Sequence, residues 1–394
     1  MILYNPHVDD FVGDPVQFLI FGRRPLKKYG FLLSEPVKRN LKVQIYKDSS
    51  MSCILPLIIF VRLPKFLRFL ITEFEFRIWL YLNKLNKDHY IRLNSNGLKD
   101  KILITFSYKS ATGLFQERKQ AFTKCKYVIF HLSHYFVNTK LKSENISQCS
   151  NSILAGDSDI TNNSYYQKHF GWYKKNFYVL HFAVQSRFKK YISFSEKFNG
   201  GIATGSFHRL SECKPANIYM DFINHFQRDS YHLLREEIHA ADIDPKTLKS
   251  YVSLYNEPSK LGEIKKFFNV SSQKKYFSLD IVHEYNKYKY AIVGEELSGF
   301  PAIGAFEAMA CGCILIAKEK YYRGLGFEPN LNFLTYDGSL SDFLKVLEDA
   351  SGNSRMSEMS EASIEYIDKR FRENIVYDSW VKKLGDLHSE VIST

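Results

Sequence analysis

Short apolar segments recur along the whole chain with segments of helix length between them, and this alternation restricts the fold more than any other feature. Segments rich in Val, Ile, Phe and Tyr and bounded by Asn, Gly, Asp or Lys are typical of buried strands. The predicted strands are Leu41–Tyr46, His89–Leu93, Ile102–Phe106, Tyr127–His131, Ser152–Ala155, Tyr178–Phe182, Ile202–Thr204, Ser250–Leu254, Tyr290–Val293, Cys313–Ala317 and Phe333–Tyr336. Strands that alternate with helices predict α/β domains with parallel sheets.

The segments between these strands predict the helices and one domain boundary. The helical stretches are Lys65–Leu85, Ile218–Ala240, Ser259–Phe268, Gly304–Ala310 and Ser357–His388. Around Ser186–Gly201 basic residues lie among Ser and Asn, and a chain of 394 residues is long enough for two domains. We therefore expect a first domain over residues 1–195 and a second over 196–375. Ligands of parallel sheets bind beyond the carboxyl ends of the strands, so the active site is expected in a cleft between the domains.

The positive charge is concentrated in the first third of the chain. The net charge is +12, but residues 1–142 contain 24 Lys and Arg against 10 Asp and Glu, while the remaining residues contain 30 against 32. This asymmetry favours contact with an anionic partner, either a phospholipid surface or nucleic acid, although a basic face without a partner is an alternative. No zinc finger, aromatic RNA-binding pair or KH loop supports nucleic acid, so none is expected as a partner.

The basic residues precede an apolar and aromatic stretch, Ile54–Leu85, which together suit docking to an anionic membrane leaflet. The alternative is that this stretch is simply a packing helix of the first domain. The most apolar run, Cys53–Val61, is too short to span a bilayer, and no targeting signal is recognised at Met1. Six scattered cysteines favour reduced thiols. We expect a cytoplasmic protein that is peripheral on the inner face of the membrane.

The most informative stretch runs from Tyr290 to Ala317 and predicts a strand, a Gly-rich loop, a short helix and a second strand. In the loop Ser298–Phe300, Gly299 would let backbone amides approach a ligand, and the helix that follows points its N-terminus at it, an arrangement that suits a diphosphate. Glu307 in the helix carries a carboxylate for ribose hydroxyls. Gly312 stands in the position that ends a helix.

Glu307-Ala-Met-Ala-Cys-Gly-Cys-Ile-Leu-Ile-Ala resembles the donor-site signature of glycosyltransferases with the GT-B fold, of the group-1 or family-4-like type. The match covers about 20 residues. It implies two facing Rossmann-like domains, a nucleotide-sugar donor bound by Glu307 and Ala308, and a C-terminal helix, residues 376–394, that returns to the first domain. No cofactor and no metal are expected beyond the nucleotide-sugar substrate.

The chain departs from this family pattern at one position. The family has two glutamates with seven residues between them, and the first would fall on Gly299. Glu295 and Glu296 are the nearest carboxylates, and we take Glu296 as a candidate catalytic residue. The segment also resembles the donor site of fucosyltransferase-like enzymes, which invert the anomeric centre, whereas the family-4-like pattern favours retention.

A second segment, Gly201–Leu210, opens the second domain. A strand runs into Gly205, where close approach to the donor is expected, and Ser206 could cap a helix or turn. Arg209 is the candidate for the donor diphosphate because a guanidinium binds phosphate oxygens bidentately. His208 is the alternative for the same role, and Arg209 could instead be an ordinary surface charge.

Candidate residues of the first domain are carboxylates and histidines at strand ends. Asp157 and Asp159 follow the strand Ser152–Ala155 and are candidates for acceptor binding or general-base catalysis. The same pattern also occurs as a metal site, an interpretation that the GT-B-like donor motif disfavours, and as a turn or helix cap, an alternative that stays open. His131 and His134 follow another strand and indicate lining of the cleft or core. Gly113 is a weaker candidate for the acceptor side.

The sequence thus favours a two-domain glycosyltransferase that acts on a carbohydrate or lipid-linked oligosaccharide acceptor in cell-surface polysaccharide or lipopolysaccharide biosynthesis. One alternative is a polyol-phosphate transferase, in which His131 and His134 would matter more. A non-catalytic protein that binds an anionic surface is the alternative of a different class.

Overall fold

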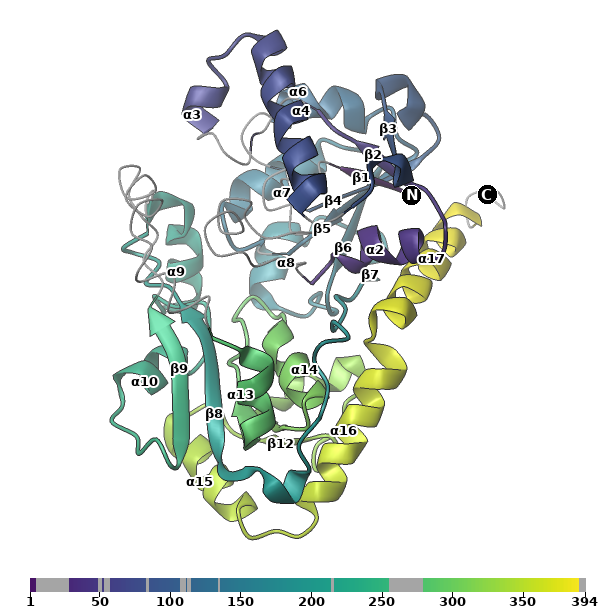
Figure 1. The fold of residues 1–394 in the computed structure, drawn as a ribbon. Helices are drawn as coiled ribbons and strands as arrows, with labels where there is room; N and C mark the ends of the chain where they lie inside the picture. Colours follow the sequence, from purple (N-terminus) through teal and green to yellow (C-terminus); the bar gives the residue numbers. More distant parts are fainter. Residues whose placement is uncertain are drawn as a thin grey trace.

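The computed structural model describes residues 1–4, 28–48, 52, 57–82, 85–106, 111, 115–133, 135–213, 216–254 and 279–389. Over these residues the chain forms two α/β domains, which lie one above the other in Figure 1. Each domain has a parallel sheet flanked by helices. The predicted fold class, two facing Rossmann-like domains, is confirmed.

The sheet of the first domain has the strand order β3-β2-β1-β4-β5-β6-β7. Its strands are β1 (Ile2–Tyr4), β2 (Val43–Tyr46), β3 (Tyr90–Leu93), β4 (Ile102–Phe106), β5 (Tyr127–His131), β6 (Ser152–Gly156) and β7 (Tyr178–Val179). Its helices are α2 (Phe31–Lys38), α3 (Leu57–Phe60), α4 (Lys65–Leu82), α6 (Phe115–Phe122), α7 (Thr139–Ser147) and α8 (Ser164–Phe170). Every strand predicted here is present, but β1 was not predicted. It is only three residues long, yet it pairs with both β2 and β4 at the middle of the sheet.

The sheet of the second domain has the strand order β12-β11-β10-β8-β9. Its strands are β8 (Phe198–Phe207), β9 (Leu248–Leu254), β10 (Tyr288–Ile292), β11 (Ile314–Ala317) and β12 (Phe333–Thr335), and all of them were predicted. The helices that follow β8 are α9 (Met220–Phe226), α10 (Arg235–Ala240), α13 (Ile281–Lys287), α14 (Ile303–Ala310), α15 (Leu340–Ala350), α16 (Met356–Arg370) and α17 (Glu373–Ser389). Short 3₁₀ turns occur at Lys87–His89, Ser95–Leu98, Phe194–Glu196, Ala216–Ile218, Glu319–Tyr321 and Arg323–Leu325.

The single helix predicted over Ile218–Ala240 is wrong, because α9 and α10 are separate helices. The chain between them pairs with the loop that follows β10: Leu233 N–H donates to the Glu295 carbonyl (2.9 Å), and Leu297 N–H donates to the Tyr231 carbonyl (2.7 Å). This pairing joins residues far apart in the sequence, so local periodicity does not reveal it. The predicted helix Ser259–Phe268 lies outside the described residues.

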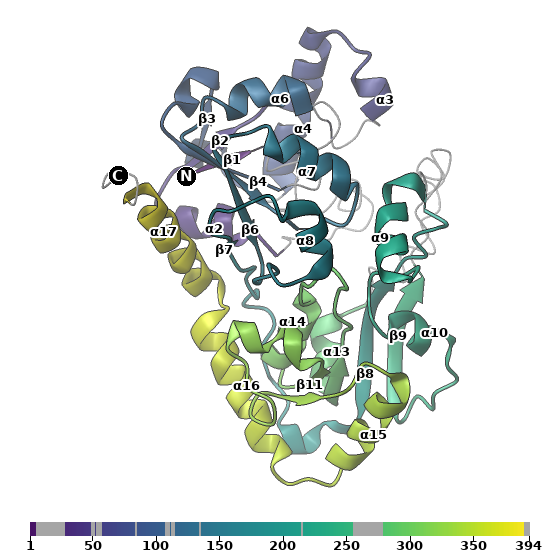
Figure 2. The same ribbon diagram turned by 180° about the vertical axis from the view of Figure 1, so that it is seen from behind.

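The C-terminal segment Ser357–His388, predicted to be mostly helical, forms the two helices α16 and α17. The break falls at Phe371, whose carbonyl accepts a hydrogen bond from Val184 N–H (2.8 Å). Helices α16 and α17 run along one side of both domains, as Figures 1 and 2 both show. In α17, Trp380 Nε1–H donates to the His181 carbonyl (2.8 Å), and Asp378 pairs with Arg39 beside α2. Helix α17 therefore lies against the first domain.

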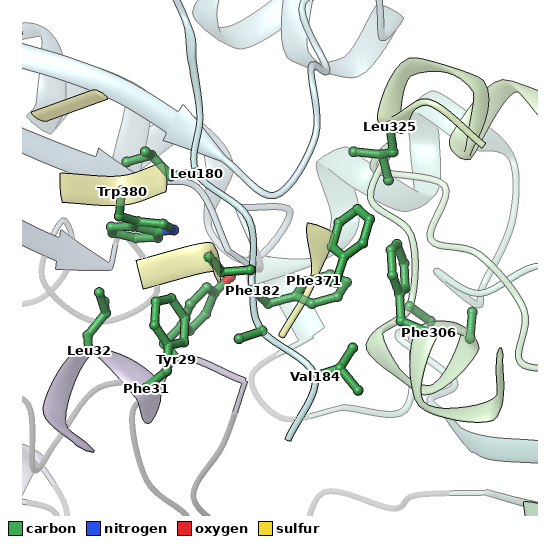
Figure 3. Packing of buried hydrophobic residues seen from close by; sticks show 14 of the residues in the cluster. Tyr29, Phe31, Leu32, Leu180, Phe182, Val184, Phe306, Leu325, Phe371 and Trp380 are labelled. Carbon is green, nitrogen blue, oxygen red and sulfur yellow. The ribbon is translucent and has the colours of Figure 1, made fainter. Parts of the chain in front are cut away.

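The segment that connects the two sheets contributes several buried apolar side chains. Between β7 and β8 the side chains of Leu180, Phe182, Val184 and Phe188 are all at most 2% exposed. Figure 3 shows Phe182 and Val184 between residues of the first domain and α17 on one side and Phe306 on the other. The rings of Phe182 and Phe306 meet nearly at right angles, with their centroids 4.8 Å apart. The two domains consequently share one hydrophobic core along this connection.

Each sheet has a point at which the strand order reverses direction. In the first sheet the chain builds from β1 toward β3 on one side and then places β4 on the other side of β1. In the second sheet β9 lies on one side of β8, and β10 lies on the other. Such switch points leave a crevice beyond the carboxyl ends of the two strands, where ligands of parallel sheets bind. The carboxyl ends of β8 and β9 point toward the first domain in Figure 1.

Candidate active site

The predicted strand, loop, helix and strand of the donor motif are present as β10, residues 293–302, α14 and β11. Helix α14 buries five of its eight side chains, namely Ala305, Phe306, Ala308, Met309 and Ala310. Beyond its end Gly312 adopts φ +79°, and its N–H donates to the Met309 carbonyl (2.9 Å). A side chain at position 312 would be strained there, so glycine is needed to turn the chain into β11.

Glu307 is half-buried on α14. Burial raises the pKa of Glu307 to about 7, and Arg187 of the connecting segment opposes this rise only in part. Burial, together with the nearby Glu307 charge, raises the pKa of Tyr285 on α13. The Tyr285 hydroxyl shares a hydrogen bond with Thr204 Oγ1 (2.8 Å), near the end of β8. A carboxylate that has lost its water gains most from new hydroxyl donors, such as those of a ribose. Ala308, predicted together with Glu307, is fully buried.

The loop predicted to bind the diphosphate contacts the first domain. Tyr135 Oη–H donates to the Ser298 carbonyl (2.8 Å), and Asn163 Nδ2–H donates to the Leu297 carbonyl (3.1 Å). The ring of Phe300 packs so closely on Gly156, at the end of β6, that a Cβ there would lie 2.8 Å from it. The loop therefore joins the two domains through its carbonyl groups and its aromatic ring.

Two backbone amides of this loop are already engaged within the second domain. Leu297 N–H donates to the Tyr231 carbonyl (2.7 Å), and Gly299 N–H donates to the Glu296 carbonyl (2.9 Å). Gly299 has φ +103°, and a Cβ there would meet Ile160 at 3.0 Å. The sequence predicts that a ligand approaches the backbone at Gly299, and in this structure the group close to Gly299 is a side chain of the first domain.

The two glutamates before the loop have different surroundings. Glu295 is buried; its Oε1 accepts Lys318 N–H (2.8 Å), and Tyr336 Oη–H reaches its Oε2 (3.4 Å). Burial raises the pKa of Glu295 despite these bonds. Glu296 is half-buried and accepts Ser298 Oγ–H (3.0 Å). Glu295 thus accepts a hydrogen bond from the residue that follows β11, whereas Glu296 lies at the start of the loop that contacts the first domain.

At Gly205, near the end of β8, the group that approaches the backbone is a side chain that the sequence analysis missed. Gly205 has φ +119°, and a Cβ there would lie 2.5 Å from Cζ of Arg235. Arg235 is the first residue of α10 and is 7% exposed. The signal available in the sequence was a glycine near the end of each of the strands β8 and β10. Gly294, after β10, has a positive φ as Gly205 has, and a Cβ there would lie 3.1 Å from Cγ of Arg235.

His208 and Arg209 directly follow β8, and His208 is half-buried. Arg209 is half-exposed and forms ion pairs with Glu212 and Glu236, each at 3.4 Å. The ring of His208 lies 5.3 Å from that of Tyr231. The structure thus places the predicted diphosphate cation among surface carboxylates.

Asp157 and Asp159 do not act as a pair. Asp157 is buried; its carboxylate accepts Tyr29 Oη–H (2.7 Å) and pairs with Lys28 Nζ (3.0 Å). Burial by itself would raise the pKa of Asp157, but Lys28, His131 and Tyr29 outweigh it and hold the pKa below its ordinary value. Asp159 is exposed and accepts both the N–H and the hydroxyl of Thr161, which is the geometry of a turn.

His131 lies in the core rather than on an open surface. It is fully buried, its Nε2 is 2.9 Å from the Leu180 carbonyl, and its ring stacks on Trp380 of α17. His134 and Gly113 lie outside the described residues. His131 therefore links β5 to the connecting segment and to the C-terminal helix.

Comparisons with known proteins identify the fold. No family model and no curated protein matches the chain. Among solved structures, HepE of Anabaena in complex with UDP is 11% identical, with 98% of this chain and 99% of that chain covered and a TM-score of 0.50. Sucrose-phosphate synthase of Thermosynechococcus elongatus is also 11% identical, with coverages of 100% and 98% and a TM-score of 0.49. The lipopolysaccharide outer core galactosyltransferase WaaB is 11% identical, with both coverages at 98% and a TM-score of 0.48.

The match to HepE extends over nearly the full length of both chains and includes both domains. The chain therefore has the two-domain GT-B fold of glycosyltransferases, in agreement with the resemblance in the donor motif.

Proposed function

We propose that this chain is a glycosyltransferase that transfers a sugar from a nucleotide-sugar donor to a carbohydrate acceptor. The observation that carries the proposal is the half-buried Glu307, which stands on the donor-motif helix at the edge of the second sheet that faces the first domain. The GT-B fold supports it, and the matching HepE structure holds UDP.

In this reaction an acceptor hydroxyl oxygen forms a bond to the anomeric carbon of the sugar. The bond from that carbon to the diphosphate breaks, the nucleoside diphosphate leaves, and the hydroxyl proton is released. Glu307 accepts hydrogen bonds from the donor ribose, and Glu296, Ser298 and Phe300 lie beside the donor, where the two domains meet. Asp157 and Asp159 belong to the acceptor domain, as do the acceptor contacts.

A thermal-shift panel of UDP, GDP, ADP and CMP, with and without magnesium, tests the donor class. A ligand at 100 times its dissociation constant adds about 2.7 kcal/mol to the stability of the folded state. We expect one nucleoside diphosphate to stabilise the chain without metal. A shift that strictly requires magnesium would contradict metal-independent binding, and no shift with any nucleotide would contradict the function.

The stereochemical outcome is a finer part of the proposal. The family-4-like motif favours retention of the anomeric configuration, and the fucosyltransferase-like features favour inversion. Once a donor is identified, the anomeric proton coupling of the product in NMR distinguishes the two. We expect retention, and an inverted product would contradict it.

Helix α4 exposes several large apolar side chains, although Phe76, Trp79 and Leu80 of the same helix are buried in the core. The spacing of Lys65, Arg68, Thr72 and Glu75 predicts that they share one face of the helix. Arg68, Thr72 and Glu75 are turned inward and are 6%, 0% and 1% exposed, whereas Lys65 is exposed. On the outside Phe66 is 69% exposed, and Tyr81 is 81% exposed. Further exposed apolar residues of α3, α4 and the turn between them are Ile59, Val61, Leu67, Phe69, Leu70 and Phe74. Apolar patches of this kind mark interaction surfaces.

We take the partner of this α4 face to be an anionic membrane leaflet that presents a lipid-linked acceptor. Lys65 and Arg77 lie exposed on the same helix, Arg62 precedes it, and the first third of the chain carries the whole positive excess. Basic charge beside exposed aromatic residues suits such a surface. No helix in the described part of the chain is both long and apolar enough to cross a membrane.

Sedimentation with vesicles tests this part of the proposal separately. We expect binding to vesicles that contain phosphatidylglycerol, weaker binding to neutral vesicles, and loss of binding in the double variant Phe66→Ser/Phe74→Ser. Leu141→Ser, an exposed leucine on α7, is the control. Equal binding by the double variant and the wild type would contradict docking through α4.

A further inference from the structure

Helix α9 follows β8 of the second domain, but it packs against α8 of the first domain. It lies at one side of the molecule and α17 at the other, as Figures 1 and 2 both show. The buried ring of Tyr165 on α8 meets three aromatic rings of α9, those of Phe222, His225 and Phe226, with centroids 5.2, 5.2 and 5.6 Å away. This α8–α9 contact therefore joins the two domains on the side opposite α17.

The polar groups of the α8–α9 contact gather around one carboxylate. Asp221 of α9 accepts Lys168 Nζ at its Oδ1 (2.6 Å), and Nε2 of His169 lies 2.5 Å from its Oδ2. One turn further along each helix, Nε2 of His225 lies 2.9 Å from Oγ of Ser164. Each of these contacts crosses from one domain to the other.

The charge balance of this contact depends on whether its imidazoles are neutral. The Asp221 carboxylate is already paired with Lys168, so it balances one positive charge, and protonation of both histidines would add two more. The side chain of His169 is only 8% exposed, so water solvates an imidazolium there poorly. Helix α7 also packs against α8; its Ser143 Oγ–H donates to the His169 carbonyl (2.5 Å), and Lys142 beside it is buried.

We propose that the α8–α9 contact is an acid-sensitive latch between the two domains, which holds them together at neutral pH and releases them when His169 and His225 take up protons. The connecting segment and α17, on the other side of the molecule, then act as the hinge. The latch does not depend on which donor or acceptor the chain binds, so its test needs neither.

The titration of the groups gives the direction of the effect. Burial lowers the pKa of His169, and the neighbouring Lys168 and His225 lower it further; the carboxylate of Asp221 opposes them only in part. Burial and then Lys168 lower the pKa of His225. The joined domains therefore hold fewer protons than the released domains. The latch is at full strength above the ordinary histidine pKa of 6.5 and weakens as the pH falls below it.

Hydrogen exchange and small-angle X-ray scattering at pH 8 and pH 5 test the proposal. We compare the wild type with the double variant His169→Gln/His225→Gln and with the control His239→Gln, an exposed histidine next to the Val252 carbonyl within the second domain. Between pH 8 and pH 5, the wild-type protection factors of residues 164–170 and 220–226, corrected for intrinsic rates, should fall about 10-fold, which corresponds to one pKa unit at one linked group. The radius of gyration should rise. Both should stay constant in the double variant, because glutamine takes up no proton, and the control should follow the wild type.

Lys168→Met tests the charge balance while it keeps both histidines. Without this lysine, Asp221 can balance an imidazolium at His169, so the fall in protection should shrink to about 3-fold. A response in Lys168→Met as large as that of the wild type would overturn the proposal. So would a wild type without a pH response, or an equal response in the double variant. Loss of protection at an unchanged radius of gyration would show that α9 detaches by itself, and the latch between the domains would be refuted.

Discussion

The carboxyl edges of the two sheets differ in where their buried charge lies. In the second domain Arg235 stands between the ends of β8 and β10, the strands of the switch point. In the first domain the switch point lies between β1 and β4, but Asp157 follows β6, two strands away from β4. The difference teaches that a charged residue at a strand end is a strong candidate only when that strand borders the switch point.

The largest effect is expected from Glu307→Ala. Removing the carboxylate should lower kcat/KM by on the order of 100-fold or more, since two charge-assisted hydrogen bonds to the ribose are lost. The fold should survive, because the variant removes a buried carboxyl that is costly to ionise. Steady-state kinetics with a nucleotide-sugar donor and circular dichroism of the same protein give both results. Near-normal turnover in a folded variant would contradict the assignment of Glu307 to the donor site.

Asp157→Asn tests the other edge. Removing the negative charge that faces Lys28 should lower the free energy of unfolding by about 3 kcal/mol, because one partner of a largely buried ion pair is lost. Since the pKa of Asp157 is lowered in the folded state, its contribution is present above its unfolded pKa and is lost as the pH falls through the folded value. Urea unfolding at pH 7 and at a pH well below the ordinary value of 3.8 measures this. A stable variant with no transfer activity would instead make Asp157 catalytic and weaken the contrast between the edges.

Glu307 also predicts a dependence on pH near neutrality. With its pKa at about 7, the group is mostly protonated at pH 6 and mostly ionised at pH 8. UDP affinity should therefore rise about 10-fold over this interval and stay flat in Glu307→Gln. The stability of the folded state should fall over the range from the unfolded pKa to about pH 7, because the folded chain holds the extra proton. Calorimetry and urea unfolding across this range check both; a flat wild-type UDP profile would contradict the raised pKa.

The smallest effect is expected where the edges meet. Tyr135→Phe removes the hydrogen bond to Ser298 O and should cost about 1 kcal/mol. The loop should become more mobile, which hydrogen exchange of residues 297–300 measures. Tyr173→Phe, which loses a hydroxyl contact to Leu154 N–H within one domain, is the control. Equal exchange in both variants would show that the contact does not hold the loop.

Much of the fold follows from the sequence, because buried parallel strands are continuous runs of β-branched and aromatic residues. β1 escaped prediction because its three residues carry no periodicity, and the break between α9 and α10 depends on a pairing with Glu295–Leu297 that is distant in the chain. The donor motif was found through local spacing. Arg235 was not, since its place depends on the register of β8 against β10, and Gly205 showed only that something approaches the backbone.

The account places the donor at the carboxyl edge of the second sheet and not at that of the first. Its most direct test is hydrogen–deuterium exchange of the wild-type chain with and without the nucleoside diphosphate that binds it. We predict protection at residues 202–207, 233–238 and 293–310, which surround the switch point of the second sheet, and unchanged exchange at 152–160. Protection confined to the strand ends of the first sheet, with none around Arg235 and Glu307, would contradict the account.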